Sequence, residues 1–174
     1  NPGADLRGIA RALYANLRAG DITQGGSSIT QQLIKLVLID PEERYQQSYE
    51  RKIKEVILSL EISRRYSKDQ ILEWYLNTIN YGRLAYGIQA AAQTYFGKNV
   101  EELTVAEGAL LAALPNRPAE YDPFTQPEAA KRRQEIALDR MFQEGYLSFD
   151  QLVAAKAEPV LEHLAPPKRY DIQA

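Results

Sequence analysis

The spacing of hydrophobic residues predicts helices along the whole chain. Apolar residues recur every three or four positions at Leu6, Ile9, Leu13 and Leu17, which is the spacing of one face of an α-helix. Similar segments begin near residues 28, 51, 68, 88, 104, 127 and 148. No long stretch alternates with the period of two that is typical of strands, and no internal repeat is present. The pattern therefore predicts an all-α fold, a single domain of about eight to ten helices.

Short polar motifs predict where several of these helices begin and end. Ser67 with Gln70, and Thr104 with Glu107, have the spacing of capping boxes, in which two side chains satisfy backbone N–H groups of the first turn. Residues 40–50 are polar and predict an irregular connection between two helices. The predicted helix stops are Gly97, Pro115 and Gly145.

The helix that begins at Arg51 has an apolar face and a charged face. At about 100° per residue, the apolar side gathers Ile53, Val56, Ile57 and Leu60, and the opposite side gathers Arg51, Lys52, Glu55 and Ser59. We expect the apolar face to pack on the core and the charged residues to lie at the rim of a cleft. Leu58 and Ile62 follow in the charged sector, so the helix should be buried nearly all round past its first turns.

The charged residues of this helix suggest an anion site. Arg51 and Lys52 flank Glu55 at i, i+4 and i, i+3, which holds the carboxylate ionised and leaves donors for an anionic ligand. The alternative is a salt-bridged surface turn, because most such charges are only solvated.

A glycine turn leads directly into the helix that begins near residue 28. The turn contains Gly25 and Gly26, and Ser27 or Ser28 can cap the helix. Thr30, Gln31 and Gln32 then place polar groups around a first turn whose N–H groups favour a phosphate, although a simple N-cap is the alternative. A P-loop is excluded, because no Gly-Lys-Ser/Thr ends the turn.

The same helix continues through residues 33–39, which are apolar almost all round. Either these residues form buried core, or one face dips into a membrane interface while Lys35 reaches headgroups or the ligand. The segment is too short to span a bilayer.

Composition and charge exclude several classes of function. The chain has 174 residues and a net charge of −2, so it lacks the basic footprint of a nucleic-acid binder. Residues 44–68 are locally basic, which favours a confined anionic ligand. The chain has no cysteine, which excludes thiolate chemistry, and its single histidine, His163, is not expected to be catalytic.

Four segments together resemble one family, the bacterial peptidoglycan glycosyltransferases, which occur alone or as part of bifunctional class A penicillin-binding proteins. The matching segments are residues 25–32 (GGSSITQQ), 51–55 (RKIKE), 68–77 (KDQILEWYLN) and 117–123 (RPAEYDP). They follow the family's order with similar spacing. The likeness covers about residues 1–157, which we predict to be the glycosyltransferase domain, and residues 158–174 are predicted to be a C-terminal tail or linker.

The resemblance implies a lysozyme-like helical fold with a head lobe and a smaller, membrane-associated jaw. It implies an enzyme that polymerises the lipid-linked disaccharide-peptide precursor, lipid II, into glycan strands by inverting transfer with loss of polyprenyl pyrophosphate. The expected location is the extracytoplasmic face of the bacterial cell membrane. The expected partners are lipid II, the growing glycan strand, the membrane surface, a following transpeptidase domain and other cell-wall synthesis proteins, but no nucleic acid. The chain itself contains no Ser-x-x-Lys motif for transpeptidation.

The resemblance also assigns roles to residues. Glu55, Lys52 and Arg51 are the expected catalytic residues, with the two cations on the pyrophosphate and Glu55 binding it directly or through a divalent cation, Mg²⁺. The expected substrate-binding residues are Gly26, Ser27, Ser28, Thr30, Gln31, Gln32 and Lys35. Ser28 stands where the family usually has threonine, which preserves the hydroxyl.

The family's first motif, which carries the general base, is expected before Asn1 and is absent from these 174 residues. Asp5 is a poor substitute, because it resembles the first-turn acid of its own helix. Losing a positioned base typically costs a factor of about 10²–10⁴ in rate, so we expect low activity from this chain. Two alternatives stay open: a lysozyme-like lytic enzyme, and a non-catalytic module that binds the lipid precursor or acts as a scaffold.

Overall fold

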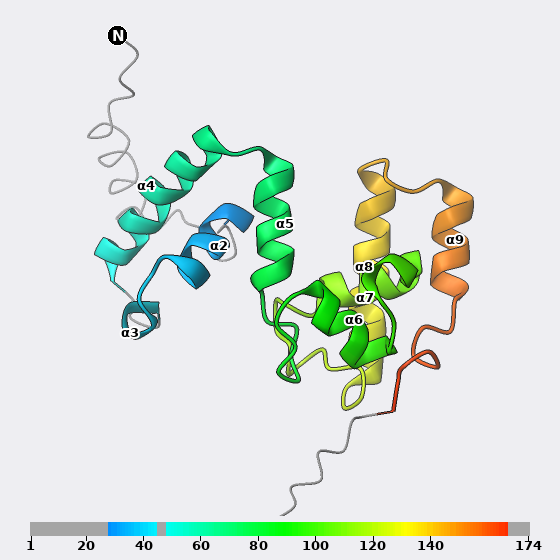
Figure 1. Cartoon of the computed structure of the whole chain (residues 1–174). Coiled ribbons are helices and arrows are strands. Elements are labelled where there is room, and N and C mark those ends of the chain that lie inside the picture. Colours follow the sequence, from blue (N-terminus) through cyan, green and yellow to red (C-terminus); the bar gives the residue numbers. More distant parts are fainter. Residues whose placement is uncertain (1–27, 45–47, 167–174) are drawn as a thin grey trace, which may run out of the picture. The chain divides into compact units, whose positions relative to one another are not determined.

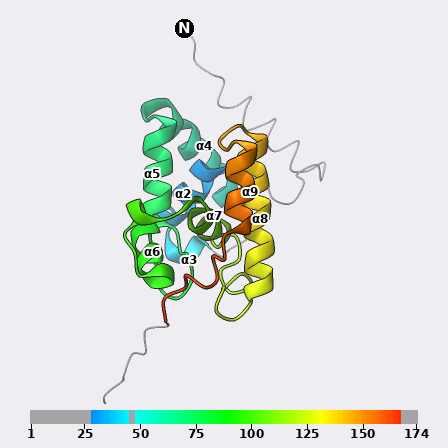
Figure 2. The same ribbon diagram turned by 90° about the vertical axis from the view of Figure 1, so that its right-hand side faces the viewer.

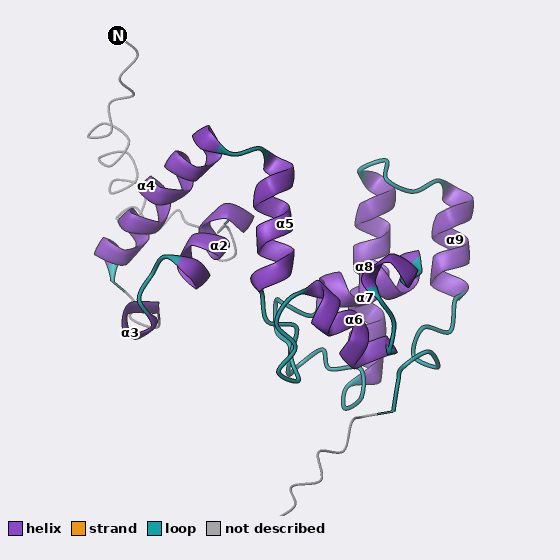
Figure 3. Cartoon of the chain, in the orientation of Figure 1, coloured by secondary structure: helices purple, strands orange, loops and turns teal. Residues whose placement is uncertain are grey.

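The computed structural model describes residues 28–44 and 48–166, and this part of the chain is helical (Figures 1 and 3). Its elements are α2 (Ile29–Val37), α3 (Pro41–Arg44), α4 (Tyr49–Arg65), α5 (Lys68–Thr78), α6 (Ile88–Phe96), the 3₁₀ turn η1 (Val100–Glu102), α7 (Val105–Ala113), α8 (Pro127–Gln143) and α9 (Phe149–Ala157). The described residues contain no β-strand, only one isolated bridge between Asn80 and Tyr86. The prediction of an all-α fold is confirmed.

The chain divides into two compact units, Asn1–Tyr75 (the first unit) and Leu76–Ala174 (the second unit). In the first unit α2 packs against α4. Leu33 and Ile34 on α2, Ile39 beyond its end and Ile71 on α5 are the buried apolar residues described there.

Serine side chains cap α2, α4 and α5 in the first unit. Ser28 Oγ accepts a hydrogen bond from Gln31 N at 3.2 Å, which satisfies a backbone donor of α2. Ser48 Oγ does the same for Arg51 N at 3.1 Å at the start of α4. Ser67 forms the predicted capping box at α5, where its backbone N donates to the side chain at position 70.

The second unit is built around α7, which packs most extensively against α8. Leu110, Leu111 and Leu114 are completely buried, so both the last turns of α7 and its cap belong to the core. Helices α8 and α9 also contact each other and lie side by side in both views (Figures 1 and 2). The amide of Gln134 on α8 donates to Ala106 O at 3.0 Å, which ties α8 to the first turn of α7.

The segment after α9 is part of the second unit. Val160 is buried, and the backbone N of Ala165 donates to Tyr95 O at 2.8 Å. Residues 158–166 therefore pack against α6 and its neighbours. The boundary at residue 157 between domain and linker stays a prediction.

Several predicted boundaries are confirmed and one connection is corrected. Helix α6 has the predicted bounds and ends at Gly97, whose φ of +67° suits glycine. The connection predicted for residues 40–50 was wrong in part, because Pro41–Arg44 form α3, with proline in the first turn where its missing N–H costs nothing. The helix predicted from Leu6, Ile9, Leu13 and Leu17 lies outside the described residues.

None of the described helices combines the length and the apolar character needed to cross a bilayer. The division into a head lobe and a membrane-associated jaw stays a prediction.

Candidate functional site

The first turns of α4 bring together the three residues that the sequence predicts to be catalytic. Glu55 Oε1 lies 3.1 Å from Arg51 Nε, and Glu55 Oε2 lies 3.1 Å from Lys52 Nζ. The Glu55 side chain is only 3% exposed. We call Arg51, Lys52 and Glu55 the α4 charge cluster. With two cations and one carboxylate, the cluster carries one net positive charge, which suits an anionic ligand.

Burial of the α4 charge cluster corrects the expected orientation of the helix. Glu55 and Ser59 are buried, whereas Ile57 on the predicted core face is 44% exposed. The charged face therefore turns inward, and the prediction that α4 is buried nearly all round is wrong, because its last turn is exposed. Charge pairing offsets the cost of this burial: Glu55 forms ion pairs with Arg51 and Lys52. Of these two, only Lys52 also donates a hydrogen bond to it, and the Arg51 pair is an ion pair alone. Ser59 Oγ donates to Val56 O at 2.8 Å.

Arg51 is anchored from two sides. Its Nη1 donates to Arg44 O at 2.8 Å, at the end of α3, while its Nε faces Glu55. Arg44 in turn donates from Nε to Ile39 O at 2.9 Å. The unpredicted helix α3 thus holds the arginine in place, and this contact could not be read from the charged residues of α4 alone.

Helix α2 presents the polar residues of the second predicted group. Ser28 caps the helix, Thr30 and Gln31 are half-buried, and Gln32 is exposed. Lys35 is half-buried in the last turn. Gly26 and Ser27 lie outside the described residues.

A cavity of about 410 Å³ opens beside the start of α2. It is lined by Ser28, Ile29, Thr30, Ser63, Tyr66, Lys68, Ile71 and Leu72. Ser28 and Thr30 were predicted to bind substrate, whereas Ser63, Tyr66 and Lys68, from the end of α4 and the start of α5, were missed. Only Lys68 had a sequence signal, because it opens a segment of the family resemblance.

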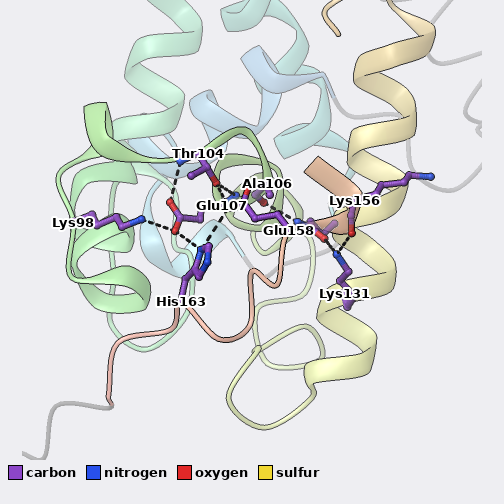
Figure 4. Close-up of polar contacts among 9 residues, drawn as sticks. Lys98, Thr104, Ala106, Glu107, Lys131, Lys156, Glu158 and His163 are labelled. Carbon is purple, nitrogen blue, oxygen red and sulfur yellow. Dashed lines mark hydrogen bonds and ion pairs between the residues drawn. The ribbon is translucent and has the colours of Figure 1, made fainter. Parts of the chain in front are cut away.

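The second unit contains another buried carboxylate, Glu107 (Figure 4). Glu107 Oε1 lies 2.7 Å from Lys98 Nζ and 3.0 Å from His163 Nδ1, and its Oε2 accepts from Thr104 N at 2.9 Å. The Thr104 hydroxyl donates to Glu158 Oε1 at 2.6 Å. We call Lys98, Thr104, Glu107, Glu158 and His163 the α7 clasp, because it joins the start of α7 to the segment after α9.

The pKa of Glu107 lies below its ordinary value. Burial raises it, but the hydrogen bonds from Lys98, Thr104 and His163 and the charge of Lys98 together lower it more. His163 therefore has a structural partner. That it is not catalytic stays a prediction.

The divalent cation expected at Glu55 does not fit this geometry. Mg²⁺ takes oxygen ligands, but both oxygens of this single carboxylate face cationic nitrogens at 3.1 Å, which would repel a further cation. Among the described residues, only Glu107, Glu158 and His163 place three ligand atoms within 4.8 Å of one another. There the ammonium of Lys98 already supplies the positive charge.

A protein-family model described as "Transglycosylase" matches residues 1–142. Similar curated proteins include penicillin-binding protein 1A of Aquifex aeolicus (strain VF5), which is 49% identical over 158 residues, covering 91% of this chain and 21% of the relative. Penicillin-binding protein 1F of Bacillus subtilis (strain 168) is 41% identical over 162 residues, covering 93% and 22%. The chain spans about a fifth of the length of the curated relatives it matches.

A solved structure was also matched, the crystal structure of penicillin-binding protein 1A from Haemophilus influenzae. It is 31% identical in sequence with a TM-score of 0.48, and the match covers 80% of this chain and 17% of that one.

Proposed function

Because the chain belongs to the transglycosylase family, we propose that it polymerises a lipid-linked disaccharide-peptide precursor, lipid II, into glycan strands. In this reaction the acceptor's 4-hydroxyl attacks C1 of the donor sugar, the configuration at C1 inverts, and a polyprenyl pyrophosphate leaves. A general base takes the proton of the acceptor hydroxyl. We propose that the family's first motif supplies this base.

The observation that carries the proposal is the net positive, mostly buried α4 charge cluster. Negative charge develops on the pyrophosphate as the bond to C1 breaks, and preformed cations stabilise that charge most effectively where water is excluded. Glu55 lies 3.1 Å from Arg51 Nε and 3.1 Å from Lys52 Nζ. Its negative charge therefore offsets the repulsion between the two cations before the substrate binds.

The remaining predicted residues would bind the donor. Ser28 and Thr30 line the cavity beside α2, and their hydroxyl groups suit sugar or phosphate oxygens. Gln31, Gln32 and Lys35 continue along the same helix. Gly26 and Ser27 complete the proposed set.

We further propose association with the outer face of the cytoplasmic membrane, where a lipid-linked substrate is found. Val37 and Leu38 at the end of α2 are more than half exposed, although both are apolar. Because the curated relatives are about five times longer than the match, a following transpeptidase domain and other wall-synthesis proteins are the proposed partners.

The test is incorporation of labelled lipid-linked precursor into polymer. It compares the 174-residue chain with a version extended N-terminally through the family's first motif, and then introduces Lys52→Ala and Glu55→Ala into the extended version. We expect polymer mainly from the extended version, and each substitution should lower the rate by a factor of about 10²–10³, the usual effect of removing one preorganised charge-stabilising group.

Lys54→Ala is the matched control. Lys54 lies on the same helix and pairs with Glu43 at 3.1 Å, but both side chains are exposed, so its loss should leave the rate within about twofold. Equal losses for Lys52→Ala and Lys54→Ala would contradict the assigned role. Unchanged polymer synthesis after Glu55→Ala would contradict the role of Glu55. Binding of the precursor without polymer from either parent chain would favour a scaffold, and shortened glycan products would favour a lytic enzyme.

A further inference from the structure

The segment of residues 68–77 is part of the family resemblance, but the proposed function gives it no role. The structure places it on α5, within hydrogen-bonding distance of α2. The hydroxyl of Tyr75 lies 3.0 Å from Gln32 Oε1, although the two residues are 43 positions apart in the sequence. This contact links the unassigned segment to the polar residues of α2.

The direction of the hydrogen bond follows from its chemistry. A carboxamide oxygen can only accept, so the Tyr75 hydroxyl is the donor. Burial raises the pKa of Tyr75 above its ordinary value, which keeps the hydroxyl protonated in neutral solution. The donor is therefore present throughout the pH range of an ordinary assay.

The bond limits the freedom of the Gln32 side chain. Gln32 is exposed, and a glutamine side chain loses rotamer entropy when it is ordered. With Oε1 held by Tyr75, the N–H donors of Nε2 are on the opposite side of the planar carboxamide. Part of the entropy that the Gln32 side chain loses on binding a ligand is then already lost in the free protein.

We propose that Tyr75 is a positioning residue that orients the carboxamide of Gln32 toward an oxygen of the lipid-linked donor. This inference rests on the proposed function, because it assumes that Gln32 contacts that donor. Tyr75 itself does not touch the reacting atoms. It acts through Gln32, as a neighbouring group that fixes the geometry of a ligand contact.

The first test is a double-mutant cycle in the N-terminally extended chain. Tyr75→Phe removes only the hydroxyl and should lower kcat/KM about 3- to 10-fold, the range expected for one oriented hydrogen bond. Gln32→Ala should lower it at least as much, and the double variant should be no worse than Gln32→Ala alone. Tyr146→Phe is the matched control, because Tyr146 is exposed in the second unit and should leave the kinetics unchanged.

A second measurement uses the same variants without turnover. The affinity of the labelled precursor should fall about 3- to 10-fold in Tyr75→Phe, while the melting temperature matches that of Tyr146→Phe. Unchanged affinity in Tyr75→Phe overturns the inference, as do additive losses from the two substitutions, which would indicate a purely structural role. If the parent protein binds the precursor but makes no polymer, the proposed function fails, and the affinity comparison still decides the role of Tyr75.

Discussion

Glu55 and Glu107 are both buried carboxylates, but they are satisfied in different ways. Glu55 is held by two cationic side chains from its own helix. Glu107 is held by Lys98, His163 and a backbone N–H, two of which come from outside its helix. The pairing of Glu55 leaves one net positive charge near the ends of the Arg51 and Lys52 side chains. The contacts of Glu107 instead join separate segments of the chain. We therefore propose a role in ligand binding for Glu55 and a role in folding stability for Glu107.

At the residue scale, Glu107→Gln should change the pH dependence of stability. The folded pKa of Glu107 is lowered, so the folded state binds fewer protons than the unfolded state, whose glutamate pKa is about 4.3. The ionised carboxylate thus contributes stability above that pH, and the contribution is lost as the pH falls through the lower folded pKa. We expect Glu107→Gln to lower the free energy of unfolding by about 1–3 kcal/mol at pH 7 and to flatten its decline below pH ~4.3.

Urea unfolding of the parent and the variant between neutral and acidic pH measures this effect. Glu120→Gln is the control, because Glu120 pairs with Arg117 at 2.9 Å on the exposed surface and should change the curve little. Parallel stability curves for the parent and Glu107→Gln would contradict the prediction.

At the element scale, the N-terminal caps of α7 and α9 differ in the contacts that they make. Thr104 caps α7 by accepting from Glu107 N at 3.1 Å, and its hydroxyl also donates to Glu158. Ser148 caps α9 with a similar box, accepting from Gln151 N at 3.2 Å, but it is exposed. One cap therefore joins two segments of the second unit, while the other serves its own helix only.

Thr104→Ala should destabilise the protein more than Ser148→Ala does. Loss of a capping hydroxyl costs about 1 kcal/mol, which we expect for Ser148. At Thr104 the substitution also removes the partner of Glu158, so about 2–3 kcal/mol is expected. Chemical denaturation measures both values, and Thr104→Ser should restore most of the loss. Equal losses at the two caps would show that the contact with Glu158 contributes nothing.

At the scale of the whole molecule, the described residues of the first unit leave apolar side chains exposed on three helices. These side chains are Ile29, Val37, Ile57, Leu72 and Trp74, together with Leu38 just after α2 and Tyr66 just after α4. Most single exposed apolar residues need no explanation, and the second unit also exposes several. Val37 and Leu38, however, are neighbours at the end of α2, and with the proposed lipid-linked substrate they favour contact with lipid. This observation motivates the proposed membrane association.

We expect the chain to bind vesicles through the end of α2. Trp74 is the only tryptophan, so its fluorescence reports on the first unit, and binding should shift the emission to the blue. The double variant Val37→Ser/Leu38→Ser should bind vesicles of zwitterionic and anionic phospholipid at least about tenfold more weakly, since each buried apolar side chain contributes about 1.5–3 kcal/mol. Leu84→Ser, at an exposed site in the second unit, is the control. Equal binding by the two variants would contradict this assignment.

The sequence alone determined the features that depend on residues close together in the chain. Periodicity predicted the helices, the capping boxes at Ser67 and Thr104 set their starts, and the i, i+3 and i, i+4 spacing of Lys52 and Arg51 to Glu55 brought three charges together. These are local rules of helix geometry, so neighbouring residues suffice to apply them. The order of four such segments also carried the family resemblance.

Only the tertiary structure decided which face of α4 is buried, and it buried the charged one. The choice depends on α2 and α3, which provide the packing surface and the carbonyl that holds Arg51. The bond from Tyr75 to Gln32 spans 43 positions, and that from His163 to Glu107 spans 56. No local pattern specifies such contacts, because they form only when packing brings separate segments of the chain together.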